Sequence, residues 1–232
     1  MPPALAPDLD DRDLPRLMAL LAGDEKHEPA AASTLDVLWV LYARVLRVSA
    51  AAPRDPERDR FLLSKGHGPA AYYAVLAARG FVPVEALAHL GSFDGILGHH
   101  PDRTRIPGVE ISSGSLGHGL PVAVGMALGL RAQGRTAPRV VCLVGDGELD
   151  EGSNHEAIAV AGALGLGALT AIVVDNHSAT HRRAGALAAR FATEGWATAT
   201  VDGRDRQALE VACRHRWPDR PGVVVAQVAP RR

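Results

Sequence analysis

Two apolar runs typical of buried strands each end in an oxygen-bearing side chain. Asp146 comes just after the run 139–144, and Asn176 comes just after the run 170–174. This separation fits one strand–helix–strand unit, which would bring both side chains to the carboxyl edge of a parallel sheet. Hard cations such as Mg²⁺ prefer oxygen ligands and keep phosphate oxygens in their shell. A carboxylate, an amide and a loop carbonyl at this edge therefore indicate a metal-assisted diphosphate site.

Glycines flank the aspartate on both sides, as Gly145 and Gly147. A loop that presents backbone N–H groups to a phosphate needs residues without a Cβ atom. A Gly-Asp-Gly turn after a strand also occurs commonly in proteins as a simple chain turn without any binding function. The second strand end at the crossover distance, together with the acidic Glu151 and Glu156 between the two, favours the binding site.

Composition limits the class of protein. A chain of 232 residues with 47% hydrophobic content can bury a full core, and we expect one domain over residues 1–232. A net charge of −1, without a basic cluster along a helix, argues against a nucleic-acid partner. Cys142 and Cys213 have apolar surroundings and no metal-ligand spacing, and are expected to be buried thiols in a reducing compartment. No apolar run is long enough to cross a membrane, and the acidic start is unlike a signal peptide, so we expect a cytoplasmic protein.

Helical and strand patterns alternate along most of the chain. Helices are expected over 11–22, 34–48, 69–78, 121–130, 154–164, 184–194 and 206–215, and strands over 60–63, 139–144, 169–174, 196–201 and 222–228. Strands separated by helices of this length imply right-handed crossovers. The expected fold class is therefore α/β, with a parallel sheet covered by helices on both faces.

Two further segments have the composition of ligand-binding loops. Residues 64–68 form a Gly-flanked turn between an expected strand and an expected helix. Residues 91–119 have little periodicity and are rich in Gly, His, Ser and Pro. A loop this long within a compact domain usually binds something.

Several segments, in the same order along the chain, resemble the transketolase family, and in particular its split form, in which the amino-terminal half is a separate polypeptide. These segments are 64–68, 98–101, 108–119 and 145–156. The resemblance covers nearly the whole chain and implies the thiamine diphosphate-binding (PP-type) fold. It also implies that the pyrimidine-binding domain is absent here and lies on a separate chain.

The resemblance implies a metal and diphosphate site. The Asp146 carboxylate, the Asn176 side chain and the main-chain carbonyl of Ser178 would hold Mg²⁺, with Ca²⁺ or Mn²⁺ as substitutes. The metal, Gly147 and His67 would hold the diphosphate of thiamine diphosphate.

The remaining cofactor contacts implied by the resemblance come from other segments. Gly114, Ser115 and Leu116 would contact the aminopyrimidine side through backbone groups. Gly145 would belong to the same cofactor-binding loop as Asp146, and Glu151 resembles an acidic residue at the family's subunit interface.

Three histidines are the catalytic candidates that the resemblance implies. His27, His67 and His100 would line the channel over the thiazolium, where they could bind sugar hydroxyls and relay protons. The segment 25–29 departs from the Gly-rich loop that the family has around His27, and Lys26 approaches a ligand less closely than a glycine would.

The implied reaction is the transfer of a two-carbon ketol unit from a ketose donor to an aldehyde acceptor, both small sugar-type molecules. In the family, the glutamate that activates the cofactor lies in the pyrimidine-binding domain. We therefore expect activity only with a C-terminal transketolase-like subunit that carries this domain and its catalytic glutamate, as an α2β2 complex without nucleic acid or membrane.

Two alternatives stay open from the sequence. The chain could be the α part of a 2-oxo acid decarboxylating or dehydrogenase enzyme, which uses the same cofactor. It could also be a non-catalytic binding or scaffold subunit. The altered His27 loop and the end of the chain at Arg232 motivate the second alternative.

Overall fold

The computed structural model of the chain describes residues 9–21, 28–66, 69–179 and 185–228, with side chains from Ser33 onward in the second range. The predicted His27 and His67 lie outside the described residues. Of the helices in these ranges, none combines the length and apolar character needed to cross a bilayer.

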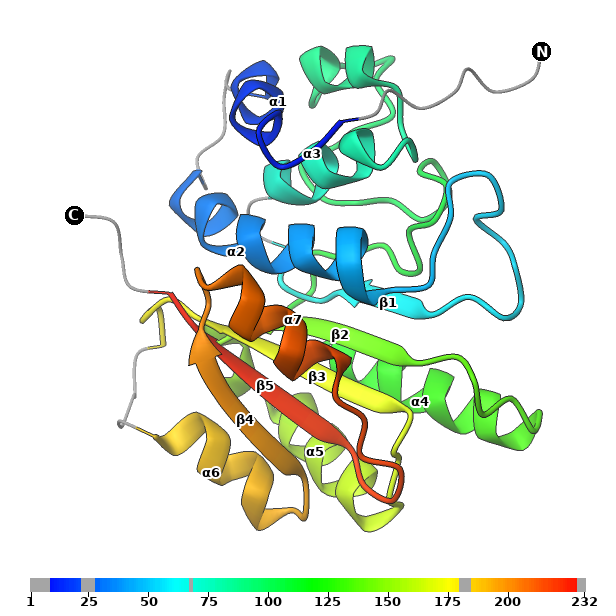
Figure 1. Ribbon diagram of the computed structural model, residues 1–232, viewed down its shortest axis with the longest axis vertical. Helices are drawn as coiled ribbons and strands as arrows, with labels where there is room; N and C mark the ends of the chain where they lie inside the picture. Colours follow the sequence, from blue (N-terminus) through cyan, green and yellow to red (C-terminus); the bar gives the residue numbers. More distant parts are fainter. Residues whose placement is uncertain (1–8, 22–27, 67–68, 180–184, 229–232) are drawn as a thin grey trace.

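A parallel sheet forms the centre of the described structure (Figure 1). Its strands are β1 (Arg60–Leu63), β2 (Val140–Gly145), β3 (Leu169–Asp175), β4 (Ala197–Asp202) and β5 (Gly222–Gln227). They lie in the order β1-β2-β3-β5-β4, and each neighbouring pair is parallel. The predicted α/β class with a parallel sheet is confirmed, and each strand begins and ends within about a residue of its prediction.

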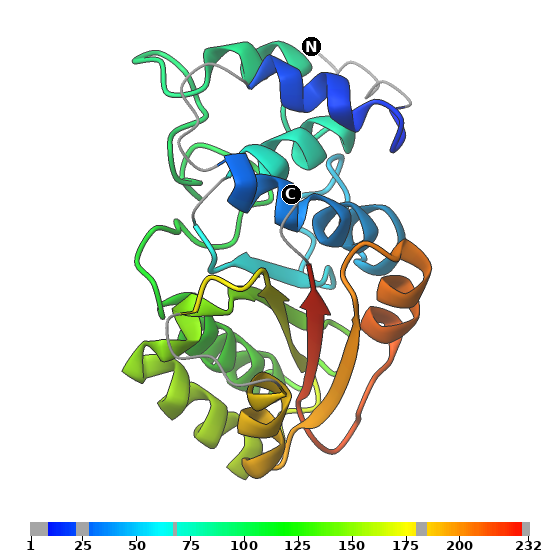
Figure 2. The same cartoon turned by 90° about the vertical axis from the view of Figure 1, so that its left-hand side faces the viewer.

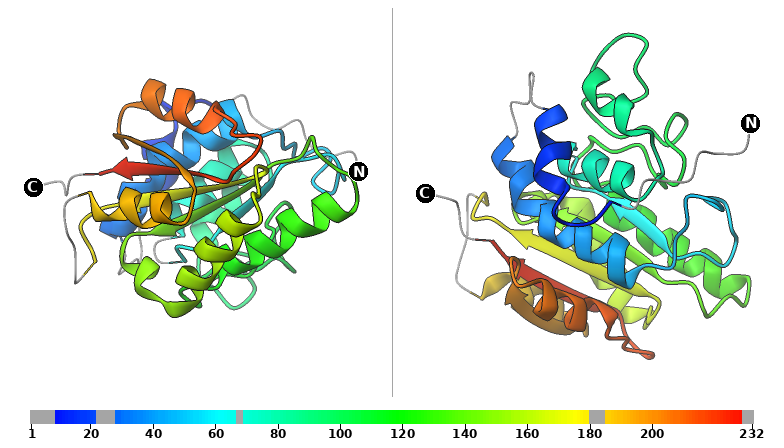
Figure 3. Two further views of the ribbon diagram at one scale, coloured as in Figure 1. Left: turned by 90° about the horizontal axis from the view of Figure 1, so that it is seen from below. Right: turned by 45° about the horizontal axis from the view of Figure 1, so that its top comes forward.

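Helices cover both faces of the sheet (Figures 1 and 3). They are α1 (Leu14–Leu20), α2 (Glu28–Val40), α3 (Ala70–Ala78), α4 (Gly119–Ala132), α5 (Gly152–Ala163), α6 (Ala186–Thr193) and α7 (Arg206–Arg214). Helices α2 and α7 lie on one face, with α1 and α3 stacked beyond α2, and α4, α5 and α6 lie on the other (Figure 2). Short turns of other helix types complete the order: η1 (Leu41–Val45), η2 (Val84–His89) and η3 (Gly147–Asp150).

Successive side chains along a strand pack alternately into two hydrophobic cores, one on each face of the sheet. In β2, Val141 and Leu143 pack in the core with α2, α3 and α7, whereas Val140, Cys142 and Val144 pack in the core with α4, α5 and α6. All six residues of β2 are buried. Because successive side chains point to opposite faces, a strand covered on both sides reads as a continuous apolar run.

The first two helices differ from their predicted bounds. Helix α1 begins only at Leu14 and is shorter than predicted. Helix α2 begins at Glu28, six residues before the predicted start. Pro29 in its first turn is favourable for a helix start, whereas the sequence prediction relied on the apolar pattern from Leu35 onward. The helical path ends through the π-turn η1, where the Leu46 N–H donates to the Leu41 carbonyl at 2.8 Å and Leu46 is extended.

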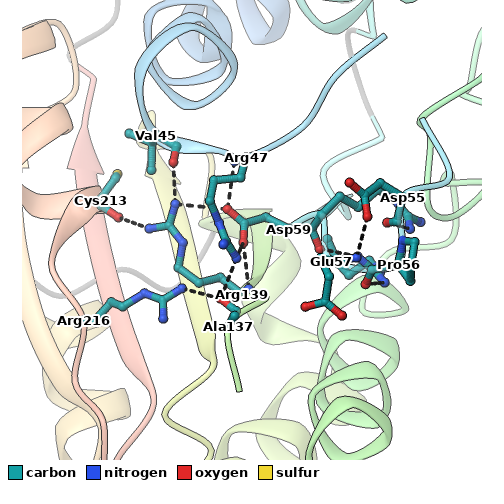
Figure 4. Close-up of polar contacts among 12 residues, drawn as sticks. Val45, Arg47, Asp55, Pro56, Glu57, Asp59, Ala137, Arg139, Cys213 and Arg216 are labelled. Carbon is teal, nitrogen blue, oxygen red and sulfur yellow. Dashed lines mark hydrogen bonds and ion pairs between the residues drawn. The ribbon is translucent and has the colours of Figure 1, made fainter. Parts of the chain in front are cut away.

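Asp59 is a fully buried carboxylate that joins three segments at the amino-terminal edge of the sheet (Figure 4). It accepts hydrogen bonds from the backbone N–H groups of Arg47 at 2.9 Å and Arg139 at 2.8 Å. Its oxygens also accept from the guanidinium Nη2 atoms of Arg47 at 3.1 Å and Arg139 at 3.3 Å. Burial pushes the pKa of Asp59 up, but these bonds and charges outweigh it and hold the pKa below its usual value. Asp59 with its partners Arg47 and Arg139, called here the Asp59 anchor, fixes the segment after η1 against the starts of β1 and β2.

We expect Asp59→Asn to lower the free energy of unfolding by about 2–4 kcal/mol at pH 7, because two guanidinium groups lose their buried counter-charge. A lowered carboxyl pKa stabilises the fold above the ordinary value of 3.8 and loses this effect as the pH falls through the folded-state pKa. Urea unfolding of the natural chain and of Asp59→Asn between pH 7 and pH 3 should therefore show a difference in unfolding free energy that decreases as the pH falls. Asp219→Asn, on an exposed carboxylate, is the control. Equal stability of Asp59→Asn and the natural chain at pH 7 would contradict the role of this anchor.

Candidate functional site

The site begins where β2 and β3 end. These strands are neighbours, with Gly145 in register with Val174. The Asp146 N–H continues the ladder by donating to the Val174 carbonyl at 3.1 Å. Asp146 and Asn176 therefore leave the sheet at the same carboxyl edge, as their spacing predicts. Their metal-binding role stays a prediction.

The loop after β3 folds over the Asp146 carboxylate. Oδ1 accepts from the Gly147 N–H at 2.9 Å and from the Ser178 hydroxyl at 2.5 Å. Oδ2 accepts from the backbone N–H groups of Ser178 at 2.8 Å and Ala179 at 3.2 Å. In this loop, between Asn176 and Ser178, His177 adopts a left-handed backbone conformation with φ of 64°. This conformation is unusual for a residue with a side chain and is found at ligand-binding turns.

Asn176 carries an unsatisfied acceptor at this edge. Its Oδ1 atom is buried and accepts no hydrogen bond from any described residue. A buried acceptor without a donor is costly, and a cation removes that cost. The Ser178 carbonyl lies near Gly147, since a Cβ atom on this glycine would be 3.6 Å from that oxygen. No group of three or more His, Cys, Asp or Glu residues in the described ranges could form a metal centre. The oxygen atoms at this edge suit a hard cation.

Lys65 is a site residue that the sequence analysis did not single out. It follows β1, is buried, and its stem packs beside Gly145, where a Cβ atom would be 3.4 Å from Lys65 Cγ and Cδ. Burial lowers the pKa of Lys65 to about 8, against the attraction of Asp146 and Glu148. A signal was present, because only two lysines occur in the chain and this one occupies a Gly-flanked turn after a strand. The edge thus presents a cationic group suited to a phosphate.

Glu148 is a second residue that the sequence analysis missed. Its buried side chain lies in η3 and accepts from the Ser64 hydroxyl, from the Gly117 N–H at 3.0 Å and from the Gly145 N–H at 3.3 Å. The Ser64 hydroxyl oxygen in turn accepts from the Gly119 N–H at 2.9 Å. Burial raises the pKa of Glu148, although the bonds from Ser64 and the two backbone groups act in the other direction. One carboxylate thus ties together the ends of β1 and β2 and the loop before α4.

The third loop brings His100 to the same edge. His100 Nδ1 donates to the Gly66 carbonyl at 3.0 Å. A Cβ atom on Gly66 would lie 2.8 Å from the Gly114 nitrogen, so these backbones touch only because the residue is glycine. Gly114 itself has a φ of 132°, a conformation that favours glycine. The structure therefore brings the predicted His100 and Gly114 together beside Gly66.

Other predicted residues lie on the exposed rim of this edge. Ser115 and Leu116 are exposed, and Leu116 is the more notable because it is a large apolar side chain. Glu151 is exposed at the start of α5, and a Cβ atom on Gly117 would lie 2.6 Å from its Cβ. Their positions are compatible with contacts to another molecule.

We expect Glu148→Ala to lower the free energy of unfolding by about 2–4 kcal/mol, because one hydroxyl and two buried N–H groups lose their acceptor. Glu148→Gln keeps one acceptor oxygen for Ser64 and Gly117, so its effect should be smaller. The measurement is urea unfolding at pH 7. The control is Glu156→Ala on the exposed side of α5, with an expected change of about 0.5 kcal/mol or less. If Glu148→Ala changed stability no more than this control, the tie between the loops would be disproved.

Comparison with known proteins shows which protein family this chain resembles. Residues 19–228 match the family model described as the thiamine diphosphate binding domain of transketolase. The chain is 54% identical over 216 residues to "Ferredoxin fas2" of Rhodococcoides fascians, covering 93% of this chain and 71% of that protein. It is 44% identical over 131 residues to a protein of Actinobacillus succinogenes that is named as one subunit of apulose-4-phosphate transketolase, covering 56% of this chain and 47% of that protein.

The fold comparison agrees. A Pichia stipitis transketolase superimposes with a TM-score of 0.76 at 24% identity, covering 94% of this chain and 36% of that one. At this identity the match supports the fold alone, which is the fold expected from the sequence. The family follows from the match over residues 19–228: the chain belongs to the transketolase family, as the segments noted in the sequence indicate, and carries the family's thiamine diphosphate-binding domain.

Proposed function

We propose that this chain, as a single domain over residues 1–232, is the cofactor-binding subunit of a two-component transketolase. The enzyme would move a two-carbon ketol unit from a ketose to an aldehyde acceptor. The observation that carries the proposal is the buried, unsatisfied Asn176 Oδ1 beside Asp146 at the ends of β2 and β3. Relatives named as transketolase subunits support the split arrangement.

The oxygen atoms at the strand edge would hold Mg²⁺ and, through it, a diphosphate. The Asp146 carboxylate, Asn176 Oδ1 and the Ser178 carbonyl are the ligands proposed. Lys65 and the Gly147 N–H would face the phosphate oxygens, and His67, outside the described residues, would join them. When bound, thiamine diphosphate supplies a nucleophilic carbon and an electron sink.

The loops from the other segments would orient cofactor and substrate. The backbone of Gly114–Leu116 is held by Glu148 through Gly117 and would meet the aminopyrimidine side. His100 is oriented by donating from Nδ1 to the Gly66 carbonyl, and its ring is proposed to bind a sugar hydroxyl. His27 lies outside the described residues, and its role rests on the family resemblance.

A partner subunit would complete the site. The chain spans 71% and 47% of the two relatives described above. We infer a C-terminal transketolase-like subunit that supplies the pyrimidine-binding domain and the catalytic glutamate, in an α2β2 complex. The exposed Leu116 and Glu151 at the strand edge are the surface proposed for this contact. We place the complex in the cytoplasm, which the two buried free thiols Cys142 and Cys213 support.

The central test is reconstitution of the chain with its partner. We expect ketol transfer from a ketose phosphate only when both subunits, thiamine diphosphate and Mg²⁺ are present. Asp146→Ala should weaken cofactor binding by at least about 100-fold in calorimetric titration, because the metal loses its carboxylate. Asp150→Ala, on a nearby exposed carboxylate, is the matched control. Transfer by the isolated chain would remove the partner from the proposal, and a reconstituted complex without cofactor binding would favour a scaffold subunit.

Lys65 gives a second prediction. The pKa of about 8 means that, between pH 8 and 10.5, the unfolded chain binds a proton that the folded chain does not. Stability of the cofactor-free chain should therefore rise with pH across this window, and Lys65→Met should abolish the rise. At pH 7, Lys65→Met should be more stable by about 2–3 kcal/mol, because no buried charge remains. The same variant should bind thiamine diphosphate more weakly, since the phosphate loses a cation.

Urea unfolding from pH 7 to 10.5 measures the first effect, and calorimetric titration of the cofactor measures the second. Arg220→Met, at an exposed arginine, should change neither. A cofactor affinity that is unchanged in Lys65→Met would place this lysine outside the phosphate site.

One observation favours a second candidate. The relative at 54% identity is named a ferredoxin, a class of electron carrier. An iron–sulfur cluster is usually held by four cysteines, whereas this chain has two, which are buried separately. The chain could instead be the cofactor half of an enzyme that decarboxylates a 2-oxo acid and passes the electrons to such a carrier. Pyruvate with an artificial electron acceptor distinguishes the two reactions, because ketol transfer consumes a ketose and releases no CO₂.

A further inference from the structure

A cavity of about 290 Å³ lies at the amino-terminal edge of the sheet, opposite the site described above. It is bounded by the end of α4, by the loop before β3, and by the loop between α7 and β5. Its charged and polar wall comes from Arg131, Arg135, Thr136 and Arg216, and its apolar wall includes Leu166 and Pro218.

The charge in this cavity is unbalanced. Three arginines line it, and no acidic residue is among its lining residues. Arg135 pairs with Glu57. Within the described residues, Arg131 and Arg216 have no carboxylate partner and are held by backbone carbonyls. Arg131 Nη1 donates to Leu164 at 2.9 Å, and Arg216 Nη2 donates to Ala137 at 2.8 Å.

The neighbouring Asp59 anchor increases the positive charge. Arg47 and Arg139 already share the single carboxylate of Asp59, and Arg216 lies beside them (Figure 4). Burial and the positive charge of Arg139 lower the pKa of Arg216, while Asp59 acts in the other direction. An anion in the cavity would relieve this repulsion.

We propose that this cavity binds a small phosphate-bearing molecule. The planar guanidinium groups of Arg131 and Arg216 each carry N–H donors beyond the one given to a carbonyl, and such groups match phosphate oxygens in pairs. A dianionic phosphate matches these two guanidinium groups, whereas a carboxylate supplies half of that charge. The apolar wall at Leu166 and Pro218 accommodates the carbon part of an ester. A bound phosphate would join the end of α4 to the loops before β3 and β5.

The test uses the full ¹⁵N-labelled chain, titrated with inorganic phosphate or glycerol 3-phosphate against sodium chloride at equal ionic strength. We expect saturable shifts at the amides of Thr136, Gly167 and Ala168, with both probes. Tighter binding of glycerol 3-phosphate would identify an ester as the preferred ligand, and tighter binding of inorganic phosphate would identify the free ion. Arg131→Ala and Arg216→Gln should each weaken binding by about tenfold.

Matched variants separate the cavity from the cofactor edge. Arg216→Gln removes the charge while keeping a polar side chain of similar stem at the cavity wall. Asp146→Ala should leave the shifts at the cavity unchanged, and so should Arg220→Ala. No saturable shift at these amides, or equal affinity in Arg131→Ala, Arg216→Gln and the natural chain, would overturn the proposal. Either result would leave the proposed transketolase function intact.

Discussion

Parallel pairing of β2 with β3 determines where the residues of the candidate site lie. The register of Gly145 with Val174 and the bond from the Asp146 N–H to the Val174 carbonyl bring two chain segments to one edge, although a whole helix separates them in sequence. A parallel pair requires a crossover, and here α5 provides it on the sheet face shared with α4. The helical layers thus keep an acidic residue and an amide residue at the same edge of the sheet.

Two buried carboxylates hold opposite ends of this framework. Glu148 joins three loops at the carboxyl edge, and Asp59 joins three segments at the amino edge. Their partners differ in kind. Glu148 is surrounded mainly by neutral donors, whereas Asp59 lies among arginines. A buried carboxylate that receives several hydrogen bonds specifies one arrangement of the segments around it, because each donor left unpaired would be costly.

Much of the fold could be predicted from the sequence, because the strands are apolar runs and the loops contain recognisable glycines. The start of α2 could not be predicted, because the residues at its start are rich in Ala and Pro and lack apolar periodicity. The placement of Asp146 and Asn176 at the same edge of the sheet followed from their spacing. Lys65 and Glu148 escaped prediction because their surroundings come from segments distant in sequence. Lys65 lies beside Gly145, and Glu148 accepts from Ser64 and Gly117. The conformation of residues 176–179 over Asp146 also needed coordinates, as local pattern does not encode which donors a carboxylate receives.

The closed loop over Asp146 changes the nature of metal uptake. Each carboxylate oxygen already accepts two hydrogen bonds, from Gly147 and residues 178–179, so its lone pairs are fully used. A cation can acquire this ligand only in exchange for one of those donors. Metal binding at this site is therefore thermodynamically coupled to the conformation of a short backbone segment. The protein must lose an internal hydrogen bond to Asp146 when this carboxylate coordinates the ion.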